Sequence, residues 1–140
     1  MNLGEKYQQL EGKLKIYLKS EPFEDGMTHP AEEIISEFLR EPRGQEQIEK
    51  LFDNYYEKET YFAQGIIHCL RHINLREISS VGYSIAKKGL KHEDGMIRQL
   101  SVSALENWAG EEALNILTTH NESNPLLRRY ISKVIADLRS

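Results

Sequence analysis

Apolar residues recur at intervals of three and four along most of this chain, which is the spacing that places them on one face of an α-helix. Polar stretches that contain glycine or proline interrupt the pattern and mark the ends of the segments. The pattern predicts about eight helices, at residues 3–18, 30–40, 45–56, 61–73, 75–90, 95–108, 111–118 and 125–138. No stretch shows the alternation of a β-strand, so the sequence predicts an all-α protein.

The connection over residues 20–29 differs from an ordinary solvated loop. It combines a proline, several acids and Gly26, but it also carries Phe23 and Met27. Large apolar residues are unusual in a connector that meets only solvent, so we also consider this segment as a binding loop. The helix that follows is expected to begin at Pro30, because amides in the first turn have no intrahelical acceptor and a proline costs nothing there.

Three glycines have expected structural roles. Gly82 and Gly89 fall within the predicted helix over residues 75–90, where a small residue permits a neighbouring helix to approach closely. Gly110 follows the helix over residues 95–108 and fits the left-handed position that commonly ends a helix.

One helix start occurs twice in the sequence. Residues 94–105, DGMIRQLSVSAL, and residues 124–135, NPLLRRYISKVI, open with a polar helix breaker and continue through an apolar residue to Arg98 or Arg128. A third, degenerate copy begins 35 residues before the first and has Ala63 in place of the arginine. Similarity at a nearly fixed period indicates stacked structural repeats.

Residues 45–140 resemble HEAT repeats, including the short bacterial HEAT-like repeats of the phycobilisome-lyase type. The resemblance rests on an Asp-x-x-apolar-Arg start and the small residues after it: Asp94, Ile97, Arg98, Ser101, Ala104, Leu105 and Gly110. It implies a right-handed α-solenoid of about three helix pairs, with residues 1–44 as an N-terminal helical cap within a single domain over residues 1–140. The second copy departs from the family pattern, with Asn124 for the usual acid and bulkier Ile131 and Val134. The spacing of 30 to 35 residues is also shorter than the roughly 40 to 47 of full-length repeats.

The resemblance also implies which side chains line the concave face, because the second helix of each pair faces that side. Aligning the copies predicts four rows across this face. The rows are Gln64, Gln99 and Arg129; His68, Ser103 and Lys133; Arg71, Glu106 and Ala136; and His72, Asn107 and Asp137. They mix charges and hydrogen-bonding groups, which suits the recognition of another protein.

Composition and charge narrow the classes of partner. With 140 residues and 39% hydrophobic residues, the chain is long enough for one core without disulfides, and Cys69 is its one cysteine. The start lacks the apolar centre of a secretory signal, so we expect a cytoplasmic protein without a membrane partner. Residues 1–60 carry 14 acidic against 8 basic residues (−6), whereas residues 61–140 carry 8 against 10 (+2). Broad nucleic-acid binding needs a basic face, so this balance favours a basic protein partner.

Two histidines have a spacing that metal sites use. His68 and His72 lie four residues apart on a predicted helix, but no third ligand is evident and Cys69 points toward the core. We therefore expect solvated or hydrogen-bonded histidines, with no metal or cofactor. Arg98 and Arg128 are expected to tie neighbouring turns together through an acid or backbone carbonyls. No catalytic triad, phosphate-binding loop or carboxylate pair is evident.

The segment over residues 52–62 interleaves aromatic and acidic side chains between two helices. A tyrosine there suits an interface anchor, since it joins a rigid ring to a polar tip. The alternative is structural: Phe52, Tyr55 and Phe62 belong to the core, while Tyr56 and Tyr61 cover the helix ends.

These patterns favour a non-catalytic protein-binding module. Its specific version is a bacterial immunity protein that neutralises a basic toxin domain by occlusion. The alternatives are a bilin-lyase-like or other enzyme-associated subunit, and a structural assembly subunit. The candidate partner-binding residues are Asp53, Tyr56, Glu57, Tyr61, Gln64, His68, Arg71, Gln99, Ser103 and Lys133.

Overall fold

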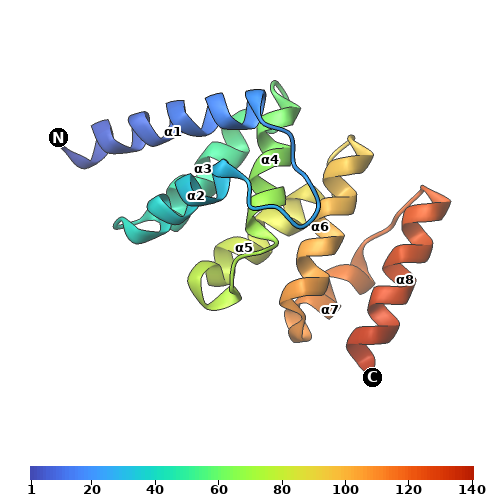
Figure 1. Cartoon of the computed structure of the whole chain (residues 1–140). Helices are drawn as coiled ribbons and strands as arrows, with labels where there is room; N and C mark the ends of the chain where they lie inside the picture. Colours follow the sequence, from blue (N-terminus) through green and yellow to red (C-terminus); the bar gives the residue numbers. More distant parts are fainter.

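A computed structural model describes residues 1–140, apart from the side chain of Ser79. Over this part the chain forms eight α-helices and no strand (Figure 1), which confirms the all-α prediction. The helices are α1 (Leu3–Ser20), α2 (Pro30–Arg40), α3 (Gly44–Tyr55), α4 (Thr60–Leu70), α5 (Leu75–Gly89), α6 (Gly95–Trp108), α7 (Gly110–Thr119) and α8 (Pro125–Arg139). The two termini lie at opposite ends of the molecule.

Most helix ends lie where the sequence pattern predicts them. His29 is the N-cap of α2, where its ring accepts from the Ala31 amide, and Pro30 is the first helical residue, as expected. The prediction for α4 was wrong at its end, because the helix stops at Leu70 instead of Ile73. A tight turn follows α4, and the Asn74 side chain then caps α5.

The junction between α6 and α7 is tighter than the sequence pattern indicates. Gly110 has the positive φ expected of it (+88°), but Ala109 before it also has a positive φ of 56°. Two successive residues with positive φ reverse the chain at once, so Gly110 begins α7 directly.

The helices pack in two series. α2 packs on α4, α4 on α6 and α6 on α8, whereas α3 packs on α5 and α5 on α7. Within the pairs, α3 packs on α4, α5 on α6 and α7 on α8. Figure 1 shows α4, α6 and α8 beginning at the same edge of the molecule and running side by side. α1 crosses one end, against α2 and α4.

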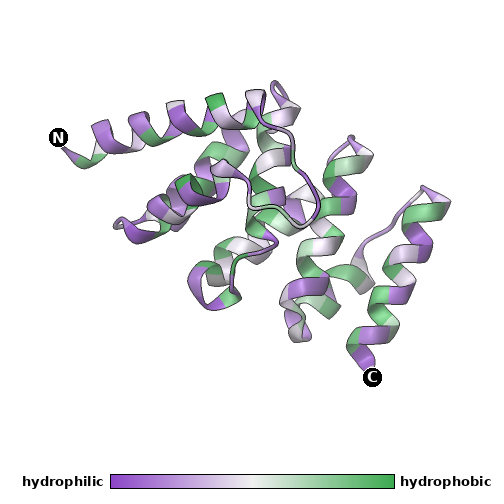
Figure 2. Cartoon of the chain, viewed as in Figure 1, coloured by the Kyte–Doolittle hydropathy of each residue, from purple (hydrophilic) through white to green (hydrophobic). Residues whose placement is uncertain are grey.

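The buried apolar residues form two clusters, and Trp108 lies between them. One extends from α1 to α6 and includes Phe38, Phe52 and Phe62, and the other extends from α5 to α8. Trp108 packs against both clusters and is partly exposed. Figure 2 shows hydrophobic and hydrophilic positions interleaved along the helices, as amphipathic helices require. In the described part of the chain no helix has both the length and the apolar character that a membrane crossing requires.

Residues about 35 positions apart meet across neighbouring helices. The Trp108 indole donates to the Ile73 carbonyl at 3.0 Å, and the Lys88 ammonium lies 2.9 Å from Asp53. This separation equals the offset between the degenerate copy and the copy that begins at Asp94. Asp94 and Asn124, 30 residues apart, cap α6 and α8 alike, each accepting from the amides two and three residues on. The copies that begin at Asp94 and Asn124 therefore start helices with the same capping hydrogen bonds.

Candidate protein-binding face

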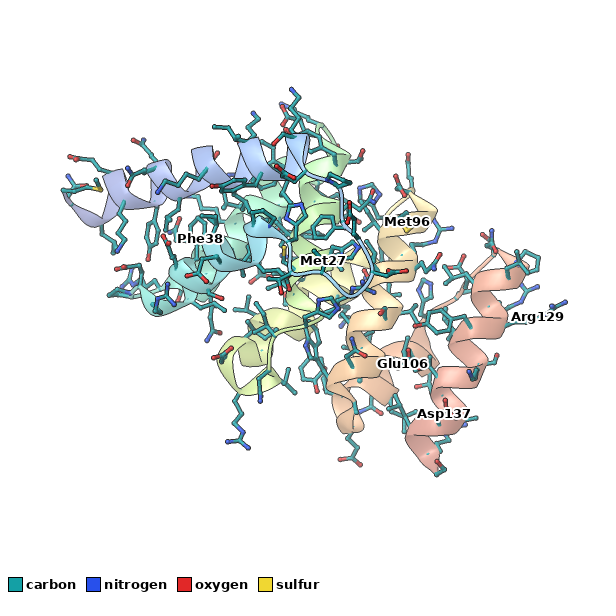
Figure 3. All side chains as sticks on the ribbon, viewed as in Figure 1. Met27, Phe38, Met96, Glu106, Arg129 and Asp137 are labelled. Carbon is teal, nitrogen blue, oxygen red and sulfur yellow. The ribbon has the colours of Figure 1, made fainter. Side chains whose placement is uncertain are left out.

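The outward side chains of α4, α6 and α8 form the surface that we call the α4–α6–α8 face. Its predicted members are Gln64, His68, Arg71, Gln99, Ser103 and Lys133. Gln99 and Lys133 are exposed, and the other four are partly buried. Figure 3 labels Glu106 on α6 and Arg129 and Asp137 on α8, which belong to the same predicted rows. The structure thus brings the candidates from these three helices onto neighbouring elements.

Side chains on adjacent helices of this face are joined diagonally. Arg71 Nη1 donates to Ser103 Oγ at 3.1 Å, and the Asn107 side chain donates to the Arg71 carbonyl at 3.1 Å. The Tyr130 hydroxyl donates to Glu106 at 2.7 Å. Burial, together with this bond to a carboxylate, raises the pKa of Tyr130 to about 12. These contacts hold α4 to α6 and α6 to α8 through polar groups at the surface.

The loop over residues 21–29 lies against α4 at one edge of the face, which the sequence does not reveal. Phe23 stacks between the rings of His29 and His68, with ring centroids 3.9 Å and 3.8 Å apart. Met27, at the tip of this loop, is 67% exposed and lines a pocket with residues of α4 (Figure 3). The large apolar residues of the loop were the signal for this arrangement. Phe23 is used in packing, whereas Met27 is accessible.

His68 is neutral in the folded protein near pH 7. Burial, reinforced by the neighbouring Arg71 charge, lowers its pKa to about 4. Its Nδ1 is buried without a hydrogen-bond partner among the described residues. His72 is exposed, with its Nδ1 3.4 Å from Glu32. The described residues contain no group of three or more His, Cys, Asp or Glu side chains placed to hold a metal.

The candidates over residues 53–61 lie mainly in another part of the molecule. Asp53 is paired with Lys88 at 2.9 Å, and the Tyr56 hydroxyl donates to the Lys88 carbonyl at 2.8 Å, so both hold α3 to α5. The Tyr61 hydroxyl contacts Glu59 at 3.3 Å, and Glu57 is exposed. The pocket beside Asp53 and Glu57 shares no residue with the pocket beside His68. Roles in partner binding stay predictions for Asp53, Tyr56, Glu57 and Tyr61.

A polar network at the turns explains the two repeated arginines. Arg98 donates to the His92 and Glu93 carbonyls at 2.9 Å and 2.8 Å, and its guanidinium meets the Glu122 carboxylate at 3.1 Å and 3.3 Å. Arg128 makes a single bond, to the Glu122 carbonyl at 3.3 Å. Burial favours a protonated Glu122, but bonds from His120, the Asn124 amide and Arg98 lower its pKa below the usual range. These polar groups bond to one another and hold the turns before α6 and α8.

Comparisons of this chain with models of protein families, with curated proteins and with solved structures find no match.

Proposed function

We propose that this protein is a non-catalytic module that binds another protein, built as a short right-handed α-solenoid of HEAT-like repeats with α1 and the residues before α3 as its N-terminal cap. The packing of α4 on α6 and α6 on α8 supports this arrangement, since repeat proteins stack one helix pair on the next. The meetings of residues about 35 positions apart also support it.

The observation that carries the binding function is the position of the loop over residues 21–29. This loop belongs to the acidic N-terminal part of the chain, and it places Glu24, Asp25 and Met27 beside His68 and Arg71. The acidic part of the protein therefore reaches the α4–α6–α8 face, where side chains that differ between repeats are accessible. An exposed methionine next to charged groups is a frequent composition of protein-binding surfaces.

The specific form of the proposal is an immunity protein that binds a basic toxin domain by occlusion. The charge of −6 over residues 1–60 supports a basic partner, since complementary charge speeds encounter and fixes orientation. Asp53 is already paired with Lys88, which also pairs with Glu49, whereas Glu24, Asp25 and Glu57 are exposed acidic groups that remain for a partner.

The face is tested by a charge change in two exposed residues. The tagged protein is expressed in its native cells, crosslinked and purified, and the captured proteins are identified and then tested for direct binding after purification. The variant Gln99→Lys/Ala136→Lys, which should repel a basic partner, is compared with Gln8→Lys/Gln9→Lys, which adds the same two positive charges on exposed residues of α1. A partner retained by the wild type and the α1 variant but lost by the face variant supports the proposal.

Equal retention of the partner by all three proteins, or no partner that binds directly, would overturn it. For the immunity version, the partner must also be toxic when expressed alone. Its toxicity should be relieved by the wild-type protein and by the α1 variant, but not by the face variant.

A further inference from the structure

A groove of about 440 Å³ lies between the first halves of α6 and α8, on the α4–α6–α8 face. Leu126, which is 73% exposed, and Tyr130 line it on α8, and exposed Gln99 lines it on α6. Arg98 and Asn124 line it too, but their side chains already make hydrogen bonds within the chain. The groove therefore offers mainly apolar surface, and the occupant that suits it is an apolar side chain.

A second copy of the chain can supply such a side chain. Large apolar residues are exposed at the starts of α6 and α8, close to the groove, and at four other places in the described part of the chain. The four others are Met1, Leu3, Ile16 and Met27. The charge beside each of them decides which one fits the groove.

The charge of α8 favours Met27. This helix has four basic residues and one acid, a net charge of +3, and Arg129 and Lys133 are exposed on it. The loop over residues 21–29, which carries Met27, has three acids and no lysine or arginine, a net charge of −3. Complementary charges speed the encounter of two surfaces and fix their orientation.

The other exposed apolar residues lack this complement. Ile16 lies on α1 within three residues of three lysines, whose charge has the same sign as that of α8: Lys13, Lys15 and Lys19. Residues 1–6 carry one acid and one base, so Met1 and Leu3 have no net charge beside them. Met27 is therefore the exposed apolar side chain whose surroundings match the groove.

We propose that two copies of the chain pair through the α4–α6–α8 face, with Met27 of each copy in the groove between α6 and α8 of the other. Glu24 and Asp25 of one copy then lie against Arg129 and Lys133 of the second. The flexible thioether of methionine adapts to an irregular groove, and the acids around it are neutralised by the cations of α8. This inference concerns a second copy and does not rest on the binding of a different protein.

One symmetry axis forms both contacts at once. Met27 lines a pocket with His68 of α4, and Gln99 lines the groove, so the loop and the groove belong to the same face. A two-fold axis perpendicular to this face, midway between them, exchanges the loop of one copy with the groove of the other, and the pair closes as a dimer. Phe23 stacks between the rings of His29 and His68, so the loop is already held and loses little conformational entropy on pairing.

The dimer is tested by sedimentation velocity of the purified full chain over a range of concentrations. We expect a reversible dimer that dissociates on dilution and has a higher Kd at high salt, because salt screens exposed charges. Glu24→Lys/Asp25→Lys changes the loop to a net charge of +1, and Arg129→Glu/Lys133→Glu changes α8 to −1. Each variant alone should be monomeric where the wild type is dimeric, since its loop and its α8 then repel each other. An equimolar mixture of the two should dimerise again, because both contacts between unlike copies are complementary.

The apolar contact is tested at two residues of nearly equal exposure. Met27→Gln should raise the Kd of the dimer roughly tenfold or more, because the pair loses two apolar contacts. Ile16→Gln on α1 is the matched control, since Ile16 is 65% exposed and Met27 is 67% exposed, and it should leave the Kd unchanged. Circular dichroism of each variant checks that the helices are retained.

Three results would overturn the assignment: a wild-type chain that is monomeric at every concentration, a Kd that Met27→Gln leaves unchanged, or a mixture of the two charge variants that stays monomeric. Because the loop and Gln99 are used in both, the dimer and a complex with another protein exclude each other. The sedimentation experiment contains this chain alone, whereas the capture experiment identifies a different protein, so failure of the dimer and failure of the proposed function are distinguishable.

Discussion

Arg98 and Arg128 occupy equivalent positions, four residues after the N-caps of α6 and α8, yet their surroundings differ. Arg98 lies between two turns and bonds to both, because Glu122 of the next turn reaches back to it. Arg128 bonds to the Glu122 carbonyl, which belongs to the turn directly before α8, so it contacts its own turn alone. The same residue in the same motif therefore contributes differently according to the partners that lie beside it.

Replacement of the two arginines by alanine should show this difference. We expect Arg98→Ala to lower the free energy of unfolding by about 2–3 kcal/mol, because it leaves the 5%-exposed Glu122 carboxylate without its main cation. Arg128→Ala removes one long bond and should cost less than about 1 kcal/mol. Urea unfolding of both variants measures the difference, and equal losses would contradict the role of the Glu122 bridge.

His68 should make stability depend on pH. Its pKa is about 4 in the folded protein and rises to its usual value near 6.5 on unfolding, so between these values the unfolded chain binds the extra proton. Stability from this residue is therefore complete above about pH 6.5 and declines as the pH falls toward 4.

His68→Phe keeps an aromatic ring to stack on Phe23 but cannot be protonated. We compare the free energy of unfolding of this variant with that of the wild type at each pH. The difference should favour the variant by about 1–2 kcal/mol more at pH 4 than at pH 7, a figure reduced because His68 is partly exposed. Urea unfolding at both pH values measures it, with His72→Gln at the exposed neighbour as the control. Parallel pH curves for the wild type and His68→Phe would exclude this effect.

At the scale of elements, helix positions follow from local periodicity, whereas the contacts between elements do not. The amphipathic stripes predicted all eight helices because each stripe is a property of neighbouring residues. The place of the loop over residues 21–29 depends on Phe23 meeting His68, and the pairing of Asp53 depends on Lys88 35 residues away. Such contacts involve residues that no local pattern links, so a candidate such as Asp53 cannot be recognised as paired from the sequence.

Close helix packing was predicted from glycine positions, and the structure confirms it. A Cβ atom at Gly89 of α5 would lie 2.0 Å from Ser101 Oγ of α6 and 2.8 Å from Ile67 Cδ1 of α4. At Gly82 it would lie 3.1 Å from the Trp108 ring. Gly89 therefore sets the distance at which α5 crosses α4 and α6.

Gly89→Ala should lower the free energy of unfolding by about 1–3 kcal/mol, although alanine favours a helix, because the added methyl group has no space. Adding Ser101→Ala removes the nearest clashing atom and should recover part of this loss. Gly12→Ala in α1 is the matched control: nothing lies within 4 Å of its Cβ, so it should gain about 0.5–1 kcal/mol. A loss at Gly12 equal to that at Gly89 would refute the packing argument.

At the scale of the whole molecule, the helices differ in how many neighbours hold them. α4 packs against α1, α2, α3, α5 and α6, whereas the substantial contacts of α8 are with α6 and α7. A helix with fewer neighbours loses fewer contacts when it opens. The N-terminal end is covered by α1, and no corresponding helix covers α8 in the described part of the chain.

This asymmetry predicts that the C-terminal end opens before the rest of the molecule. Amide hydrogen exchange should be faster in α8 than in α4, because opening α8 breaks contacts with two helices and opening α4 requires disruption of most of the core. Val134→Ala on α8 should speed exchange in α7 and α8 and leave α2 to α5 unchanged. Ile66→Ala on α4, which is equally buried, should cost about 2–5 kcal/mol and speed exchange in every helix. If Val134→Ala instead speeds exchange equally in all eight helices, the chain unfolds as one cooperative unit. The free energy of opening a helix would then not depend on how many helices it packs against.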